Sequence, residues 1–246
     1  MKVLIHGSTG RMGKILCELL CAGYPGLELT AQVSPEAVSD PANCVFTSLA
    51  EVNCEVECVI DFSHHTAVSA LMDFCVAKKL PVVVATTGHT PEEKVVLAEA
   101  AKQIPVFFSA NMSIGVALIA ELAKKAAAVF PNADIEIVEK HHNQKLDVPS
   151  GTALLLAHKI QEVREDSVLL VGRHENGKRT AKEIGIHSLR MGNEVGTHEI
   201  IIATGSETVT IKHEAENRSL FANGALAAAA FLAGKSAGLY SMGDIV

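Results

Sequence analysis

Aromatic residues are scarce in this chain, and tryptophan is absent. Aromatics make up only 4% of the 246 residues. Proteins that bind single-stranded nucleic acid stack the bases on aromatic side chains, so such platforms are missing here. The formal net charge is −7, with no basic stripe, which also argues against a nucleic-acid partner. We therefore expect no nucleic acid among the partners.

Long hydrophobic runs are lacking as well. The longest, Ala225 to Ala233, is far shorter than the roughly 20 residues that a membrane-spanning helix needs. Charged residues are only 20% of the chain and hydrophobic residues are 48%, a composition that disfavours disorder. The length suits one large domain or two smaller ones with a buried core. We expect a cytoplasmic protein with no membrane partner.

The six cysteines all lie in the first third of the chain. Cys17 and Cys21 share one face of a predicted helix, and Cys54 and Cys58 flank the start of a buried strand. This placement favours buried, reduced thiols over disulfides. It supplies no set of ligands for zinc, so we expect no metal site.

A strand, a glycine-rich turn and a helix open the chain. The β-type run Lys2 to His6 leads into Gly7-Ser8-Thr9-Gly10-Arg11-Met12-Gly13, and a helical pattern follows. Gly7 and Gly10 permit a tight turn and close approach of a pyrophosphate, while Gly13 permits close packing of helix on strand. This context favours a dinucleotide site over a purely structural turn.

Strands and helices then alternate through the first half of the chain. Strands are predicted at 28–33, 58–62, 81–85 and 105–108, with helices at 67–78 and 92–102. Such alternation predicts a doubly wound parallel sheet, whose ligands bind at the carboxyl ends of the strands. The loops 62–64, 86–88 and 109–112 should therefore line the cofactor cleft. For His64 and His65, an ordinary polar turn is an equally fair interpretation.

From residue 113 the pattern changes to consecutive strands. A helix at 114–130 and a strand at 134–139 precede a helix that starts at Ser150, and alternating runs follow at 182–190, 197–204 and 207–213. Strands without helices between them imply a mixed or antiparallel sheet, hence a second α+β domain. The apolar helical stretch 219–237 must be buried. We expect an α/β chain with a Rossmann-type dinucleotide-binding domain at 1–112, on which 219–246 packs back, and a substrate-binding and oligomerisation domain at 113–218.

The segment Glu139 to Ala153 concentrates the groups that carry chemistry. His141 and His142 can titrate near neutral pH, and Lys145 supplies a further donor or a fixed charge. Ser150 is a good N-cap, and the first-turn N–H groups of Gly151 and Thr152 would favour a carboxylate or phosphate. An anionic substrate is implied. Taken alone, the segment fits about equally well a polar loop before a capped helix.

These residues resemble the 4-hydroxy-tetrahydrodipicolinate reductase (dihydrodipicolinate reductase) family over nearly the whole chain. The resemblance rests on the Gly7 to Gly13 turn, on the runs 85–88, 109–113 and 190–198, and above all on His-His-x-x-Lys-x-Asp-x-Pro-Ser-Gly-Thr-Ala at 141–153. The last run is very specific for this family.

The resemblance implies an oxidoreductase of lysine and diaminopimelate biosynthesis. NADPH or NADH delivers hydride to a cyclic unsaturated dicarboxylate, formed by loss of water, to give tetrahydrodipicolinate. His141 is implied as proton donor and acceptor, Lys145 as a further proton donor, and His142, Gly151 and Thr152 as substrate-binding residues. The cofactor would be bound by residues of three loops, Gly7, Ser8, Thr9, Gly10, Arg11, Met12, Ala85, Thr86, Thr87, Ser109, Ala110, Asn111 and Met112. A homotetramer built through the strands of the second domain is also expected.

Two positions depart from the family pattern. The family often has an acidic residue after the second strand, where this chain has Ser34; we therefore expect both NADPH and NADH to be accepted, with no strong bias toward NADH. Glu36 is the alternative, because a carboxylate reaching the ribose would restore an NADH preference. Ala85 replaces a glycine, which requires an ordinary backbone conformation there.

Other functions and residues stay open at this point. A non-catalytic dinucleotide sensor would not need both His141 and Lys145. A metal hydrolase using His141 and His142 is disfavoured, because adjacent residues on a strand or loop point in different directions. For Arg190 and His198, packing on a strand is at least as good an interpretation as a role in the active site.

Overall fold

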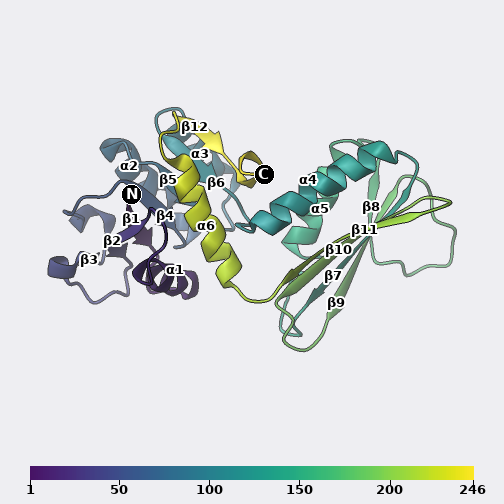
Figure 1. Cartoon of the computed structure of the whole chain (residues 1–246), viewed down its shortest axis with the longest axis horizontal. Helices are drawn as coiled ribbons and strands as arrows, with labels where there is room; N and C mark the ends of the chain where they lie inside the picture. Colours follow the sequence, from purple (N-terminus) through teal and green to yellow (C-terminus); the bar gives the residue numbers. More distant parts are fainter. The chain divides into compact units, whose positions relative to one another are not determined.

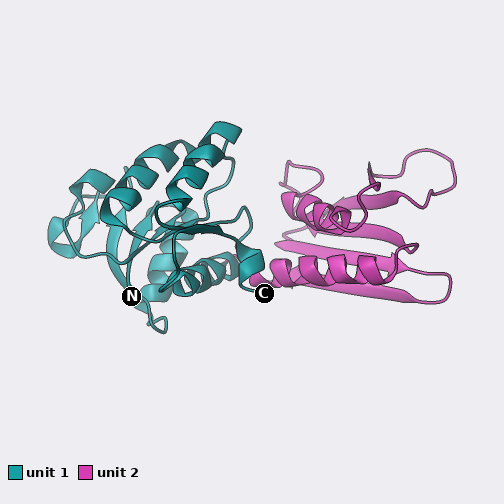
Figure 2. Ribbon diagram, turned by 90° about the horizontal axis from the view of Figure 1, so that it is seen from above, with its two compact units in different colours: residues 1–113, 219–246 teal, residues 114–218 magenta.

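The computed structural model describes all 246 residues and divides into two compact units. Unit 1 contains Met1–Ser113 and Ser219–Val246, and unit 2 contains Ile114–Arg218. Figure 2 shows the two units in different colours. The chain therefore leaves unit 1 once, completes unit 2 and returns.

Unit 1 is a seven-stranded sheet in which every pair of neighbouring strands is parallel. The order is β12-β6-β5-β4-β1-β2-β3, so the direction of winding reverses between β1 and β4. Ligands of doubly wound sheets bind at such a switch point. The strands are β1 (Lys2–His6), β2 (Glu28–Val33), β3 (Val45–Phe46), β4 (Cys58–Asp61), β5 (Val82–Val84), β6 (Pro105–Phe108) and β12 (Gly238–Tyr240).

Helices cover both faces of this sheet. The helices α1 (Arg11–Cys21) and α6 (Ser219–Leu232) pack on one face, and α2 (Val68–Lys78) and α3 (Pro91–Ala101) on the other (Figure 1). With both faces covered, the strands can be apolar throughout, and all four residues of β4 are buried. The predicted Rossmann-type architecture is confirmed.

The C-terminal segment differs from the prediction in its second half. Helix α6 is buried as expected, but it ends at Leu232 and does not reach Ala237. Gly234 has φ of +74°, a left-handed conformation that stops a helix. The chain then forms β12, which pairs with β6 at the edge of the sheet. Close packing of α6 on the loop after β6 requires Gly224, where a Cβ would lie 1.6 Å from the carbonyl oxygen of Met112.

The cysteines of unit 1 are all free thiols, but they are not all buried. Cys58 and Cys75 are buried as expected, whereas Cys21 is exposed, so the expectation is wrong for that residue. The buried face of α1 runs through Gly13, Leu16 and Leu20. Cys21 follows Leu20 directly, and one residue of a helix turns its side chain about 100° from its neighbour, which here is toward solvent.

Unit 2 is a mixed five-stranded sheet with the order β11-β10-β7-β9-β8. Strand β7 lies antiparallel to β10 and parallel to β9. The apolar side chains of one sheet face pack with α4 and α5 to form the core. The elements are α4 (Ile114–Val129), β7 (Asp134–His141), α5 (Gly151–Gln161), β8 (Val168–Val171), β9 (Glu183–Arg190), β10 (Gly196–Ala203) and β11 (Thr208–Ala215). The expected α+β character is confirmed.

Candidate active site

The glycine turn after β1 leaves no room for side chains. Gly7 has φ of +84°, and a Cβ there would lie 2.6 Å from the carbonyl oxygen of Phe62. At Gly13 a Cβ would lie 2.1 Å from the carbonyl oxygen of Gly7. Gly10 is the N-cap of α1, and no side chain caps this helix. The first-turn N–H groups are thus available to an anion, as in other dinucleotide-binding turns.

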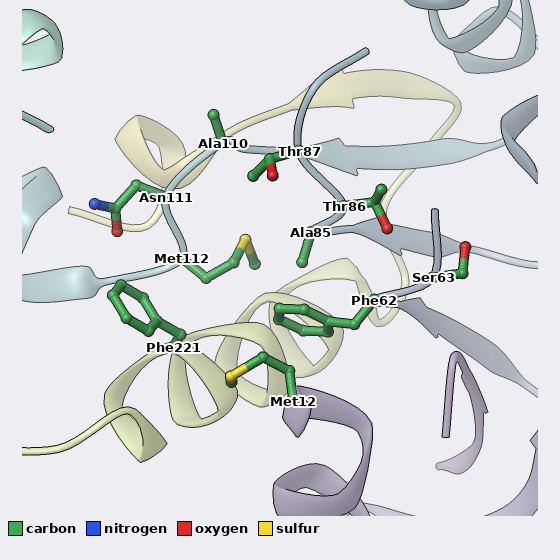
Figure 3. A pocket seen from close by; sticks show the side chains of 10 residues that line it. All are labelled: Met12, Phe62, Ser63, Ala85, Thr86, Thr87, Ala110, Asn111, Met112 and Phe221. Atoms are coloured by element: carbon green, nitrogen blue, oxygen red, sulfur yellow. The ribbon is translucent and has the colours of Figure 1, made fainter. Parts of the chain in front are cut away.

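Two cavities adjoin at the carboxyl ends of the strands, because Phe62 and Ser63 line both. The first, of about 310 Å³, is mainly apolar and is shown in Figure 3. The aromatic rings of Phe62 and Phe221 and the thioethers of Met12 and Met112 surround it. The second cavity, of about 590 Å³, lies along the glycine turn and the loop after β2. Both volumes fall in the range of small-molecule sites.

Most of the predicted cofactor residues line the two cavities. Gly7, Thr9 and Gly10 line the second cavity, and Met12, Ala85, Thr86, Thr87, Ala110, Asn111 and Met112 line the first. Ser8, Arg11 and Ser109 line neither. Ser8 is buried, Arg11 is exposed, and the Ser109 hydroxyl donates to the carbonyl oxygen of Asn111 at 2.7 Å. Ala85 has no positive φ, so the alanine fits this loop.

Sequence reasoning missed Phe221 and the buried carboxylate that ties the cavity loops together. Asp61, at the end of β4, is 2% exposed. Its Oδ1 lies 2.8 Å from Nδ1 of His6 and accepts from the Ser63 hydroxyl at 2.6 Å, while Oδ2 accepts from the Thr86 hydroxyl at 2.6 Å. One carboxylate thus contacts the ends of β1, β4 and β5.

In unit 2, the predicted proton donor His141 is the last residue of β7. Its Nδ1 lies 2.5 Å from Oε2 of Glu139, and its ring meets the ring of His198 edge to face, with centroids 5.2 Å apart. Nε2 makes no hydrogen bond within the chain. A Cβ at Gly196 would lie 3.0 Å from this Nε2, so the glycine keeps that side of the imidazole open.

Glu139 is fully buried and has four donors. Arg190 donates from Nη1 to Oε2 and from Nη2 to Oε1, each at 2.8 Å, and the backbone N–H of Ser150 donates to Oε1 at 3.2 Å. Burial alone would raise the pKa of Glu139, but the hydrogen bonds from His141 and Arg190 hold that pKa well below its usual value. The carboxylate is therefore ionised, and the fourth donor is the Nδ1–H of His141.

His198 completes the polar cluster on β10. Its Nε2 lies 3.0 Å from the hydroxyl of Ser150, which itself accepts from the N–H of Ala153 and so caps α5. Burial, followed by the proximity of His141, lowers the pKa of His198 to about 3. His198 is therefore neutral near pH 7 and supports the helix cap, whereas Arg190 holds Glu139. His198 thus contacts the predicted proton donor His141, whereas Arg190 contacts Glu139 behind it. The sequence left the roles of both residues open.

The predicted substrate-binding residues follow β7 in the chain. The N–H of His142 donates to the carbonyl oxygen of Glu194 at 2.8 Å. Lys145 forms an ion pair with Asp147, Nζ to Oδ1 at 2.8 Å, and this hydrogen bond lowers the pKa of Asp147. Gly151 and Thr152 form the first turn of α5, and a Cβ at Gly151 would meet no atom within 4 Å. Space for an anion is thus present beside the helix N-terminus.

No group of three or more His, Cys, Asp or Glu side chains is arranged to hold a metal ion. No helix is both long and apolar enough to cross a membrane.

The parallel sheet, the glycine turn at its switch point and the two cavities are those of a Rossmann-type dinucleotide-binding domain. Comparison with known protein families identifies the family to which the chain belongs. The model of the dihydrodipicolinate reductase N-terminus matches residues 1–112, and that of the C-terminus matches residues 115–246. The chain belongs to the dihydrodipicolinate reductase family.

Relatives match the chain over its full length. A 4-hydroxy-tetrahydrodipicolinate reductase of Caldanaerobacter subterraneus subsp. tengcongensis is 45% identical, over 100% of this chain and 98% of its own. One from Clostridium perfringens is 41% identical with the same coverage. The structure of a dipicolinate-bound dihydrodipicolinate reductase from Paenisporosarcina sp. TG-14 is 27% identical, with a TM-score of 0.83, and the match covers 100% of this chain and 99% of that one.

Proposed function

We propose that the chain reduces 4-hydroxy-tetrahydrodipicolinate to tetrahydrodipicolinate, with loss of water, in lysine and diaminopimelate biosynthesis. The reaction consumes one NAD(P)H and one proton. The observation that carries the proposal is the cluster in unit 2, where His141, with Nε2 unbonded, stands beside the capped N-terminus of α5 in a chain of the dihydrodipicolinate reductase family. That cluster offers a proton and an anion site together.

The residues of unit 1 fit a nicotinamide dinucleotide, which supplies hydride when bound. The turn 7–13 would hold the pyrophosphate, because any Cβ at Gly7 or Gly13 would collide with backbone and the helix start is uncapped. The apolar cavity of Phe62, Met112 and Phe221 suits the nicotinamide ring, and Thr87 and Asn111 offer polar groups at its wall. The second cavity would take the adenosine part.

The residues of unit 2 supply charge for a dicarboxylate and a proton for the ring. The N–H groups of Gly151 and Thr152 would bind one carboxylate at the helix N-terminus. His142 and the ammonium of Lys145 follow on the same loop and are the proposed donors to the second carboxylate. Because Nδ1 of His141 is held by Glu139, any proton that His141 transfers passes through Nε2. Lys145 is proposed as a further proton donor.

The activity test uses freshly generated substrate with each nucleotide and follows the loss of reduced cofactor. We expect wild-type turnover, and a decrease in kcat of roughly 10²–10⁴-fold for His141→Gln, the usual effect of losing a general acid. The nucleotide affinity of this variant, measured by fluorescence titration, should be unchanged because His141 belongs to unit 2. Near-normal kcat in a folded His141→Gln enzyme would refute the assignment.

The choice between NADH and NADPH depends on Glu36. Its Oε2 accepts from the hydroxyl of Ser34 at 2.7 Å and of Thr9 at 3.3 Å, all three in the wall of the second cavity. The hydrogen bond from Ser34 lowers the pKa of Glu36, so the residue carries charge at neutral pH. A carboxylate there would bind ribose hydroxyls and repel a 2′-phosphate. We propose that both nucleotides are used and that Glu36 shifts the balance toward NADH.

Glu36→Gln should therefore raise the NADPH:NADH ratio of kcat/KM by about tenfold, which is about 1.4 kcal/mol of discrimination. Glu51→Gln is the matched control, since Glu51 also accepts from a neighbouring hydroxyl, that of Thr47 at 2.9 Å, but lines neither cavity. Steady-state kinetics of the three enzymes at one pH and salt concentration give the ratios. A ratio in Glu36→Gln equal to that of wild type would contradict this role.

We also propose a homotetramer. In unit 2, α4 and α5 pack on one face of the sheet, and the opposite face carries the partly exposed apolar side chains of Val138, Leu189 and Ile201. A sheet face with apolar residues is suited to burial against a second copy. Light scattering at micromolar concentration should give four times the mass of the 26.0 kDa chain. A monomeric mass would exclude this assembly.

A further inference from the structure

We propose that Glu139 is a positioning residue for His141: it fixes the imidazole with Nδ1 protonated and Nε2 toward the substrate, and Arg190 holds Glu139 in place for this task. The inference rests on the proposed function, because it concerns the proton that His141 transfers. The proposal follows from the contacts around one buried carboxylate.

The contact between Glu139 and His141 defines which atom of the pair carries the proton. Hydrogen bonds from His141 and Arg190 offset the burial of Glu139 and keep its pKa below the usual range. An ionised carboxylate can only accept, so the contact of 2.5 Å requires a proton on Nδ1 of His141. In the neutral ring Nε2 then has a lone pair, and in the charged ring it has a proton to give.

The strand register and Arg190 together orient the carboxylate of Glu139. Glu139 and His141 are two residues apart on β7, so their side chains project from the same face of the sheet. The register pairs His141 with Arg190 on β9 and Glu139 with His198 on β10. Arg190 donates to both oxygens of Glu139 and also to the carbonyl oxygen of Asp147 at 2.8 Å. The carboxylate is thus fixed in orientation by a planar, two-pronged donor.

Glu139 also connects the imidazole of His141 to the proposed anion site. Oε1 of Glu139 accepts from the N–H of Ser150, the N-cap of α5, while Oε2 takes the imidazole. One carboxylate therefore relates the proton donor to the helix start that is proposed to bind the substrate. Gly196 leaves room beside Nε2 of His141, because a Cβ at position 196 would lie 3.0 Å from this nitrogen.

The amide Glu139→Gln is the sharpest perturbation, because it keeps the shape and can present an N–H to Nδ1, which favours the opposite tautomer. In serine proteases the corresponding change behind the catalytic imidazole lowers kcat by about 10⁴-fold. We expect a decrease in kcat of at least about 10²-fold here, with KM for the substrate changed far less. Glu136→Gln is the matched control: Glu136 lies on the same strand, with Oε2 2.8 Å from Nε2 of His187, and it lies outside the cluster.

A double-mutant cycle separates positioning from a structural role. If Glu139 acts through His141, then Glu139→Gln should change kcat by less than about threefold in a His141→Gln background. If the two effects instead multiply, or if Glu139→Gln alone retains wild-type kcat, the proposal is overturned. Glu136→Gln should stay within about threefold of wild type at an unchanged native mass, and a loss as large as that of Glu139→Gln would equally contradict it.

Thermal denaturation shows whether Glu139→Gln folds. If it does not fold, a second variant, Arg190→Gln, tests the same proposal. Arg190→Gln keeps the Glu139–His141 pair but removes its clamp, so we expect a loss of about tenfold in kcat that also disappears in the His141→Gln background. Persistence of that loss would overturn the proposal. A wild-type chain without any reductase activity would instead contradict the proposed function itself, so the two failures are distinguishable.

Discussion

The ionised carboxylate of Glu139 is the constraint on which the arrangement of unit 2 depends. A buried carboxylate costs several kcal/mol to desolvate, and only a full set of donors offsets that cost. Here the donors are His141 at the end of β7, Arg190 at the end of β9 and the backbone N–H of Ser150, the N-cap of α5. Satisfying one charge therefore fixes the imidazole of His141, the guanidinium of Arg190 and the N-terminus of α5 at the same time.

Unit 1 applies the same principle with Asp61. This buried carboxylate contacts His6, Ser63 and Thr86, the residues at or just beyond the ends of three parallel strands. These strands flank the point at which the direction of winding reverses, so the hydrogen bonds hold the loops that line both cavities. In each unit, a buried acid at or near a strand end forms hydrogen bonds with neighbouring strands and loops, and such networks favour a single arrangement of the groups that they connect.

Sequence patterns predicted the elements whose signal is local. The strand at 28–33 and the strand at 105–108 are confirmed to the residue, and the glycine turn lies between β1 and α1 as expected. The strands β3, β8 and β12 were not predicted. They have only two to four residues each and lie at sheet edges or next to them, so they show too little periodicity to be recognised.

The contacts of the site that could not be predicted from the sequence depend on pairing between strands that are distant in the chain. Arg190 lies 51 residues and His198 lies 59 residues after Glu139 in the chain, and only the register of β9, β7 and β10 brings the three together. Glu139 itself had a usable signal: an acid two residues before His141 on a predicted strand must share its face. Phe221 reaches its cavity only because the chain returns to unit 1 after residue 218.

Nε2 of His141 and the first turn of α5 are proposed to contact one and the same dicarboxylate. A crystal structure of the chain with reduced nucleotide and pyridine-2,6-dicarboxylate is the direct test. We expect a ligand carboxylate about 3 Å from the backbone nitrogens of Gly151 and Thr152, with Nδ1 of His141 on Glu139 and Nε2 facing the ligand. A ligand bound away from these nitrogens, or an imidazole turned so that Nε2 contacts Glu139, would contradict it.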